Sequence, residues 1–372
     1  MKAVISGGGT GGHIYPALSI AEKIMENEND SSILYIGTRE GLESRIVPEK
    51  GYEFKTVQVR GFQRKLSLEN AKRVALFMKG LAQSLAIIKR NKPDVVIGTG
   101  GYVCGPVVLA GALLGIPTLI HEQNAFPGIT NKFLSRFADR VLISFDDSRR
   151  FFTKSKSVVL TGNPVRGEIT SASMAQAREK LGIPEGKKMV LSVGGSGGSG
   201  TINAAMKSVI PALAAEDYAF VHATGRLHYD EFMEGLRGIE LKDYQVVTDY
   251  IDNMADILAA SDLVVCSAGA ITISEITCLG KPSIVIPKAY TAENHQEYNA
   301  RSVKNSGAGE MILEKDLNGD TLLKAVFSIL SDEKLLESMS QNSIRISNPH
   351  ASDTIYEQIK SLMAEKKGIK NK

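Results

Sequence analysis

The sequence has little cysteine and lacks the short motifs that mark several large enzyme classes. Its three cysteines, Cys104, Cys266 and Cys278, are too few and too scattered for a disulfide framework or a structural zinc site, which favours a reducing compartment. No Gly-x-x-x-x-Gly-Lys-Ser/Thr motif occurs, so a P-loop kinase or ATPase is excluded. No Asp-x-Asp triplet occurs and the histidines lack metal-ligand spacing, so we expect no metal site.

Residues 95–120 carry no charge over 26 positions, which is long enough to cross a bilayer. The stretch contains six glycines and two prolines, and a lipid-exposed helix would leave backbone groups unpaired around them. We therefore expect a buried strand, a glycine loop, a short helix and a second buried strand. We also expect no signal peptide, because only three apolar residues, Ala3-Val4-Ile5, lie between Lys2 and the glycine run, far short of an apolar signal region.

The net charge of +3 hides a basic segment, Phe62–Pro93, which has eight basic residues and one acid. Apolar residues at 74, 77, 78, 81, 85 and 88 follow helical spacing within it. Two interpretations stay open: a core helix with a solvated face, or a surface patch that rests on anionic lipid. Nucleic acid is less favoured, because aromatic residues are not interleaved with the charges.

A length of 372 residues suggests two domains, and short β-branched runs alternate with helical stretches in both halves. Apolar runs of four to six residues between helices predict an α/β fold with parallel sheets covered on both faces. The predicted strands are Lys2–Ser6, Ile33–Gly37, Asp94–Gly98, Thr118–Glu122, Val141–Ser144, Lys188–Val193, Tyr218–Ala223, Gln245–Val247, Leu263–Cys266 and Ser283–Pro287. We expect the first helix to begin near Tyr15-Pro16, since proline suits a first turn. An amphipathic helix is expected after Asn348-Pro349.

Each half opens with a strand, a glycine loop and a helix, and both loops contain Gly-x-Gly-x-x-Gly (Gly7, Gly9, Gly12 and Gly195, Gly197, Gly200). Such loops bring backbone N–H groups close to an anion, although a plain strand-to-helix turn looks the same. Dinucleotide dehydrogenases have an acid at the end of the next strand. Both halves lack it here, which disfavours NAD, while Arg39 leaves NADP formally open.

Several polar side chains follow predicted strands, where open α/β sheets bind ligands. His13 lies at a helix start, whose positive end favours a neutral ring; the residue is either a general base or a backbone cap. Residues 121–124 (His-Glu-Gln-Asn) form either a ligand site or a solvated loop. Glu275, expected in the first turns of a helix, is either a ribose ligand or a partner of the helix dipole.

With these residues in view, the chain closely resembles the MurG-type N-acetylglucosaminyltransferases of bacterial peptidoglycan synthesis. The resemblance rests on Gly7–Leu18 (GGGTGGHIYPAL), Gly98–Pro106 (GTGGYVCGP), His121–Asn131 (HEQNAFPGITN), Thr161–Arg166 (TGNPVR), Gly194–Gly198 (GGSGG), Gly269–Glu275 (GAITISE) and His295–Ala300 (HQEYNA). It implies a two-domain GT-B fold of Rossmann-like domains that face a cleft. We place the domains at 1–163 (acceptor and membrane side) and 164–346 (UDP-GlcNAc binding), with a helix at 347–372 returning to the first domain. The reaction implied is inverting transfer of GlcNAc from UDP-GlcNAc to the C4 hydroxyl of the muramoyl sugar of lipid I, giving lipid II and UDP.

The resemblance also implies roles for single residues. His13 and Glu122 match catalytic positions, and we favour His13 as the base because it lies beside the first glycine loop; Tyr102 and His121 match the acceptor side. Positions that match substrate contacts are Thr10, Gly11, Gly12, Asn124, Arg166, Ser196, Ile251, Ala270, Ile271, Thr272, Glu275 and Gln296. Two departures stand out: Cys266-Ser267 replaces the usual Ser-Arg, which removes the charge of that arginine, and Gly197 replaces a larger residue.

The partners implied are UDP-GlcNAc, lipid I and, through Phe62–Pro93, an anionic membrane surface, with no nucleic acid and no metal cofactor. The location implied is the cytoplasmic face of the cell membrane, as a peripheral protein. Other classes stay open: another GT-B enzyme, such as a diacylglycerol glycosyltransferase or the non-hydrolysing UDP-GlcNAc 2-epimerase, and a non-catalytic subunit that binds nucleotide sugars.

Overall fold

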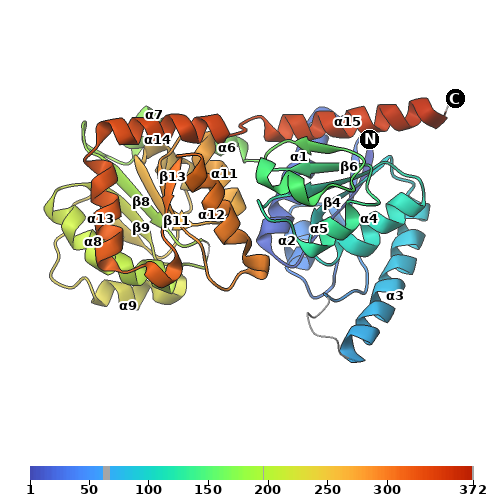
Figure 1. Cartoon of the computed structure of the whole chain (residues 1–372), viewed down its shortest axis with the longest axis horizontal. Coiled ribbons are helices and arrows are strands. Elements are labelled where there is room, and N and C mark those ends of the chain that lie inside the picture. Colours follow the sequence, from blue (N-terminus) through green and yellow to red (C-terminus); the bar gives the residue numbers. More distant parts are fainter. Residues whose placement is uncertain (62–67, 196, 371–372) are drawn as a thin grey trace. The chain divides into compact units, whose positions relative to one another are not determined.

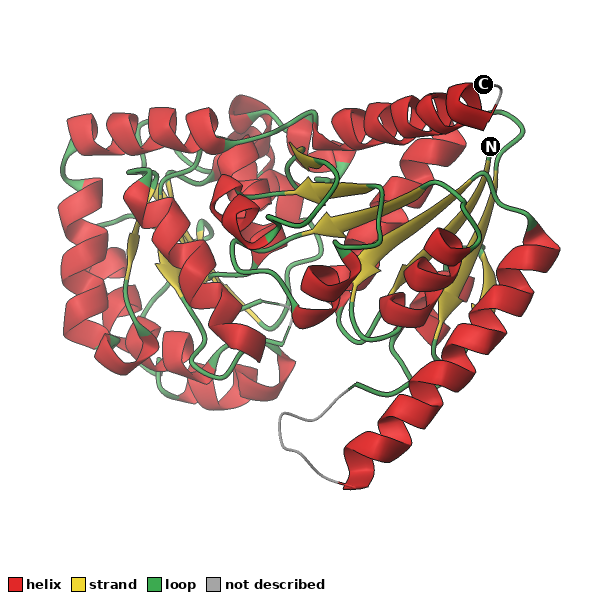
Figure 2. Ribbon diagram, turned by 45° about the vertical axis from the view of Figure 1, so that its right-hand side comes forward, coloured by secondary structure: helices red, strands yellow, loops and turns green. Residues whose placement is uncertain are grey.

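The computed structural model describes residues 1–61, 68–195 and 197–370. The chain folds into two compact units. Unit 1 comprises Met1–Pro164 and His350–Lys372, and unit 2 comprises Val165–Pro349. Figure 1 labels many elements of each unit, and Figure 2 shows strands between layers of helices within each of them. The prediction of two parallel-sheet α/β domains is confirmed.

Unit 1 contains a seven-stranded sheet in the order β3-β2-β1-β4-β5-β6-β7, and every pair in it is parallel. Its central strands are buried over nearly their whole length, because helices cover both faces of the sheet. The strands are β1 (Lys2–Gly7), β2 (Ser32–Gly37), β3 (Glu53–Thr56), β4 (Val95–Gly100), β5 (Thr118–Glu122), β6 (Arg140–Ile143) and β7 (Val158–Leu160).

The helices of unit 1 pack on both faces of this sheet, with α1, α2 and α15 on one apolar cluster and α3, α4 and α5 on the other. They are α1 (Gly11–Asn27), α2 (Glu43–Glu49), α3 (Leu68–Asn91), α4 (Cys104–Leu113), α5 (Ile129–Leu134) and α15 (Ala351–Lys370), with a 3-10 turn η1 (Asp146–Phe151). The succession β4, glycine loop, α4, β5 confirms the interpretation of residues 95–120. No helix in the described part of the chain is long and apolar enough to span a bilayer.

Helix α1 begins at Gly11, which corrects the predicted start near Tyr15-Pro16. The chain is extended at Thr10 (φ −144°, ψ 157°), directly after Gly9 at φ 85°, so the helix starts as soon as the glycine turn ends. Pro16 therefore lies inside α1, where it has no N–H to donate to the carbonyl of Gly12. The earlier start places His13 in the first turn of α1.

Helix α3 has buried residues along its second half and exposed ones near its beginning. Leu81 and Ile88, in its second half, are buried in the core of unit 1. Near its beginning Val74 and Met78 are 51% and 57% exposed, and Lys72 and Lys79 are also exposed. The predicted basic segment also includes residues 62–67, which lie outside the described residues.

Helix α15 packs on α1 within unit 1. Its apolar residues Ile355, Ile359 and Leu362 are buried in the same cluster as Ile14 and Leu18. Two ion pairs also join α15 to the rest of unit 1: the Lys23 Nζ–Asp353 Oδ1 distance is 2.6 Å, and Arg140 donates to Glu365 at 2.7 Å. After unit 2 the chain thus returns and completes the core of unit 1.

Unit 2 contains a six-stranded parallel sheet in the order β10-β9-β8-β11-β12-β13. One of its faces packs on α8, α9 and α13 through buried Val190, Phe220 and Val265. The strands are β8 (Met189–Val193), β9 (Ala219–Ala223), β10 (Gln245–Thr248), β11 (Leu263–Ser267), β12 (Ser283–Ile286) and β13 (Gly309–Met311). The helices are α6 (Gly167–Thr170), α7 (Met174–Lys180), α8 (Gly200–Ala215), α9 (Tyr229–Glu234), α10 (Met254–Ala260), α11 (Ala270–Cys278), α12 (His295–Asn305), α13 (Gly319–Leu330) and α14 (Glu333–Ile346), with 3-10 turns η2 (Arg226–His228), η3 (Ala292–Asn294) and η4 (Glu314–Asp316).

All ten predicted strands are present, with ends that differ by at most two residues. The sequence prediction missed β3, β7 and β13. Each of these is an edge strand of three or four residues, and all three are partly solvent-exposed, so they lack the continuous apolar run of a central strand.

Candidate functional site

The strand order locates one candidate site in each unit. In unit 1 the order reverses between β1 and β4, and in unit 2 it reverses between β8 and β11. Ligands of open parallel sheets bind at such switch points, at the carboxyl ends of the strands. The first glycine loop follows β1 and the loop with Tyr102 follows β4, while the second glycine loop follows β8. Both predicted loops thus lie where the topology favours a ligand.

In unit 1 the glycine loop and the first turn of α1 fix the position of His13. The Nδ1 atom of His13 lies 3.0 Å from the carbonyl oxygen of Gly8. A carbonyl can only accept, so this contact requires a proton on Nδ1. When the ring is neutral, its lone pair is therefore on Nε2, the nitrogen that a general base needs.

The loop after β4 packs directly against this histidine. A Cβ on Gly100, which has φ 112°, would lie 2.7 Å from Cδ2 of His13. A Cβ on Gly101 would lie only 2.2 Å from the carbonyl oxygen of Gly8. Thr99 also donates its hydroxyl to the carbonyl of His13, at 2.8 Å. Only glycine at 100 and 101 allows this approach, which brings Tyr102 close to Gly9.

Glu43, which the sequence analysis does not predict as a functional residue, fixes the first glycine loop through hydrogen bonds. Its carboxylate is fully buried and accepts hydrogen bonds from Gly9 N (3.1 Å), Thr38 N (3.0 Å) and the Thr38 hydroxyl (2.7 Å). Gly8 N donates to Gly100 O at 3.3 Å. The backbone amides of Gly8 and Gly9, which we expected to bind an anion, therefore donate hydrogen bonds to other groups of the protein. The only available signal was a pair of glycines, Gly37 and Gly41, on either side of the loop that leads to Glu43.

The His-Glu-Gln-Asn segment is not a solvated loop, because His121, Glu122 and Gln123 are at most 2% exposed. Glu122 accepts hydrogen bonds from both amide groups of Asn124, backbone (3.0 Å) and side chain (3.3 Å), from Gly128 N (3.2 Å) and from Asn131 Nδ2 (2.8 Å). Burial raises the pKa of Glu122, and these hydrogen bonds oppose that rise. The carboxylate thus orders residues 122–131.

His121 lies beneath this segment. Its Nε2 is 2.9 Å from the carbonyl of Gly162, and its Nδ1 is 3.0 Å from the amide of Gln123. Burial lowers the pKa of His121 to about 4, so the ring is neutral at physiological pH. Its side chain is completely buried, so an acceptor does not reach it directly in this geometry.

In unit 2 two backbone carbonyls of the second glycine loop, those of Gly194 and Gly198, accept hydrogen bonds from side chains. Ser267, at the end of β11, donates to Gly194 O at 3.0 Å, and Lys288 donates to Gly198 O at 3.1 Å. Gly198 has φ 76°, and a Cβ there would lie 2.1 Å from Thr224 O, so glycine is required. Ser196, which the sequence predicts as a substrate contact, lies outside the described residues.

Arg166 and Glu275 meet in unit 2 although 109 residues separate them. The Nε and Nη2 atoms of Arg166 donate to Oε1 of Glu275 at 3.3 and 3.2 Å, and Nη1 lies 3.3 Å from Glu168. Burial raises the pKa of Glu275, and the Arg166 charge opposes that rise. Glu275 lies in the second turn of α11 rather than the first, so the interpretation as a simple dipole partner is weakened.

The other predicted substrate contacts of unit 2 follow the carboxyl ends of β10, β11 and β12. Ala270, Ile271 and Thr272 form the first turn of α11, directly after β11. Gln296, near the start of α12, accepts a hydrogen bond from Lys288 N at 3.0 Å. Ile251 is buried, at 7% exposed, in the loop after β10. All of them follow the carboxyl ends of strands in one sheet.

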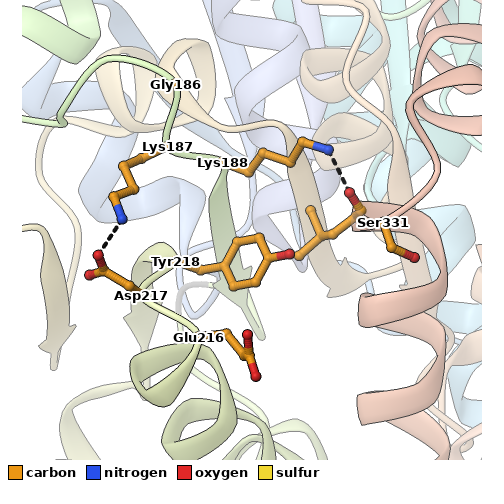
Figure 3. A pocket seen from close by; sticks show the side chains of 8 residues that line it. Gly186, Lys187, Lys188, Glu216, Asp217, Tyr218 and Ser331 are labelled. Atoms are coloured by element: carbon orange, nitrogen blue, oxygen red, sulfur yellow. Dashed lines mark hydrogen bonds and ion pairs between the residues drawn. The ribbon is translucent and has the colours of Figure 1, made fainter.

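A separate cavity of about 320 Å³ opens near the amino ends of β8 and β9, at the opposite edge of the same sheet. Figure 3 shows Lys187 paired with Asp217 and Lys188 bonded to the chain at Leu330–Ser331. Since these cations already have partners, and since no predicted residue lines the cavity, we assign no chemistry to it. Among the described residues, no group of three or more His, Cys, Asp or Glu side chains could hold a metal ion.

Comparison with known proteins links these sites to a family. The model of the glycosyltransferase family 28 N-terminal domain matches residues 3–143, and that of the C-terminal domain matches residues 189–358. A Clostridioides difficile (strain 630) protein is 54% identical over 361 residues, covering 96% of this chain and 88% of the relative. It is named UDP-N-acetylglucosamine–N-acetylmuramyl-(pentapeptide) pyrophosphoryl-undecaprenol N-acetylglucosamine transferase.

Solved structures agree with this. The crystal structure of Acinetobacter baumannii MurG has a TM-score of 0.79 at 26% identity and covers 97% of this chain and 99% of its own. A putative UDP-N-acetylglucosamine 2-epimerase from Listeria monocytogenes has a TM-score of 0.69 at 14% identity, covering 98% and 97%, a likeness of fold alone. The chain therefore belongs to glycosyltransferase family 28 and, within it, to the MurG-type N-acetylglucosamine transferases.

Proposed function

We propose that this protein transfers GlcNAc from UDP-GlcNAc to the C4 hydroxyl of the muramoyl sugar of lipid I, with inversion, giving lipid II and UDP for peptidoglycan synthesis. The observation that carries the proposal is the 54% identity over 361 residues with a relative named for this transfer. The likeness extends through both units, so it includes the loops of both switch points.

Unit 2 binds the donor in this proposal. Glu275 accepts the ribose hydroxyls, the backbone at Ile251 meets uracil, and residues 270–272 line the nucleotide. The Arg166 pair uses only Oε1 of Glu275, which leaves Oε2 as an acceptor for a ribose hydroxyl. Arg166, Ser196 and Gln296 contact the diphosphate and donor sugar.

Unit 1 binds the acceptor and supplies the base. His13 removes the proton of the attacking hydroxyl through Nε2, and its Nδ1 contact to Gly8 supports this role. Thr10, Gly11, Gly12, Tyr102 and Asn124 contact the sugar or diphosphate groups. Since Glu122 and His121 are buried and hydrogen-bonded, we assign them to positioning residues 122–131 rather than to proton transfer.

Charge on the departing UDP is offset by protein groups in this proposal, without a metal cofactor. The sequence has no Asp-x-Asp triplet of the kind that carries a metal-bound diphosphate. Fixed donors and cations aimed at the developing charge perform the same task.

The assay that tests the function offers purified protein UDP-GlcNAc with and without a lipid I analogue. We expect UDP release and a GlcNAc-extended lipid only when the analogue is present. A 2-epimerase would convert the donor with no acceptor, and a diacylglycerol glycosyltransferase would require diacylglycerol. A non-catalytic subunit would bind UDP-GlcNAc and release nothing; any of these three results contradicts the proposal.

We further propose peripheral attachment to the cytoplasmic face of the membrane through α3, because lipid I is a lipid-borne substrate. Exposed Val74 and Met78 lie among Lys72, Arg73 and Lys79 at the beginning of this helix. An apolar pair within a basic surface suits the boundary of an anionic bilayer.

Replacing Lys72, Arg73 and Lys79 by glutamine should weaken binding to anionic vesicles roughly 100-fold at low salt, at about 1 kcal/mol per charge. Co-sedimentation with phosphatidylglycerol vesicles measures this. The matched control replaces Lys180, Lys304 and Lys324 of unit 2, which removes the same charge and should leave binding intact. Undiminished binding of the α3 variant would return this segment to a purely structural role.

A further inference from the structure

Lys288, which follows β12 and Pro287, touches two parts of the predicted donor site. Its backbone N–H donates to Oε1 of Gln296 at 3.0 Å, and its ammonium donates to the carbonyl of Gly198 at 3.1 Å. In the sheet, β12 neighbours β11 and β11 neighbours β8. The side chain therefore reaches across the end of β11 to the glycine loop after β8.

The charge of Lys288 is not offset by an acid. No carboxylate in the described part of the chain lies within 4.0 Å of its ammonium. Glu314 is bonded to the neighbouring Ala289 N at 2.8 Å and to the Thr201 hydroxyl at 2.7 Å, and not to Lys288. An ammonium group has three N–H donors, and one of them is used by Gly198, so two can bind an anion.

Arg166, the other positively charged side chain predicted at the donor site, is paired with carboxylates. Arg166 is paired with both Glu275 and Glu168, so two carboxylates offset its charge. Ser267 is neutral and its hydroxyl is bonded to Gly194 O. Among Arg166, Ser267 and Lys288, it is therefore Lys288 that places a positive charge at the glycine loop with no carboxylate paired to it.

We propose that Lys288 binds the diphosphate of the nucleotide donor and stabilises the charge of the departing nucleoside diphosphate. This inference rests on the proposed function, since it names a further residue of the same donor site. The ammonium sits on the carbonyl of Gly198, at the loop that we expect to hold the diphosphate, and a charge-assisted hydrogen bond there is stronger than a neutral one. The Gln296 contact couples the backbone of Lys288 to the predicted sugar-side residue.

Titration calorimetry with UDP and with uridine tests this on the full-length protein. Lys288→Met should weaken UDP binding about 10–100-fold, the loss expected for one hydrogen bond to a charged group. Uridine, which has no phosphate, should bind the variant as it binds the unchanged protein. The salt dependence of UDP binding should also become shallower, because one cation has been removed. Lys288→Arg, which keeps the charge, should retain most of the affinity for UDP.

The matched control is Lys304→Met, on α12 of the same unit, which removes a half-exposed lysine paired with Glu310. It should leave UDP affinity unchanged. Unaltered UDP binding by Lys288→Met would overturn the proposal, and so would an equal loss for uridine, which would point to a disturbed loop. Failure of the unchanged protein to bind UDP would instead overturn the proposed function, and the inference with it.

Discussion

Replacing His13 by alanine should lower kcat for GlcNAc transfer about 10²–10⁴-fold and change the affinity for UDP little. The proton of the attacking hydroxyl would then have no positioned base, and general-base catalysis is worth about this factor. UDP affinity should be largely retained because the predicted uracil and ribose contacts, together with Arg166 and Lys288, belong to unit 2, whereas His13 belongs to unit 1. Steady-state kinetics with a lipid I analogue, combined with calorimetry for UDP, measure both quantities.

His13→Asn is the control that separates chemistry from structure. The asparagine amide can donate to Gly8 O in place of Nδ1, at a position where the histidine contact is 3.0 Å, but it offers no base. We therefore expect this variant to keep the stability of the unchanged protein and to be as inactive as His13→Ala. Recovery of activity in His13→Asn would show that the ring acts by holding the glycine loop.

Replacing Glu122 by alanine should lower the free energy of unfolding by about 3 kcal/mol, since four donors would lose their buried acceptor. Each buried donor left unpaired costs about 1–3 kcal/mol, and partial relaxation of the loop reduces the sum. Urea unfolding followed by circular dichroism gives the difference. Activity should fall as well, because Asn124 depends on this carboxylate for its position.

Glu122→Gln distinguishes a positioning role from a catalytic one. Asn131 Oδ1 is buried without a partner among the described residues, so a rotated Asn131 amide could accept from the new glutamine NH₂ group, whereas Gly128 N would lose its acceptor and His121 O one of its donors. We expect this variant to regain part of the stability and activity that Glu122→Ala loses and to keep the pH profile of the unchanged protein. A lost acidic limb in that profile would identify Glu122 as the base in place of His13.

The sequence was sufficient for the architecture because the signals involved are local. Strands such as β1, β5 and β11 are short apolar runs that only a sheet covered on both faces can bury, and glycine loops mark where helices follow them. The length and the repeated strand–loop–helix unit were enough to predict two such domains. Edge strands β3, β7 and β13 escaped because a half-exposed strand of three or four residues has no distinctive pattern.

The candidate site residues follow the ends of strands, as expected. Their hydrogen bonds, ion pairs and burial, however, depend on contacts between segments that are distant in the sequence. The glycines at 37 and 41 mark the loop before Glu43, but they do not indicate that its carboxylate binds Gly9, which is 34 residues away. The pairing of Arg166 with Glu275 spans 109 residues, and the Lys288 bond to Gly198 spans 90. Likewise, only burial decides that His121 is neutral and enclosed rather than exposed to a ligand.

The sequence by itself thus determined the fold class, the number of domains and the strand ends that carry polar groups, since periodicity and glycine placement act over a few residues. Tertiary structure alone decided which of those groups already have hydrogen-bond or ion-pair partners and which keep an uncompensated charge. The physical reason is that hydrogen bonding and desolvation depend on which neighbours the fold supplies. Those neighbours come from other helices and loops, tens of residues away along the chain.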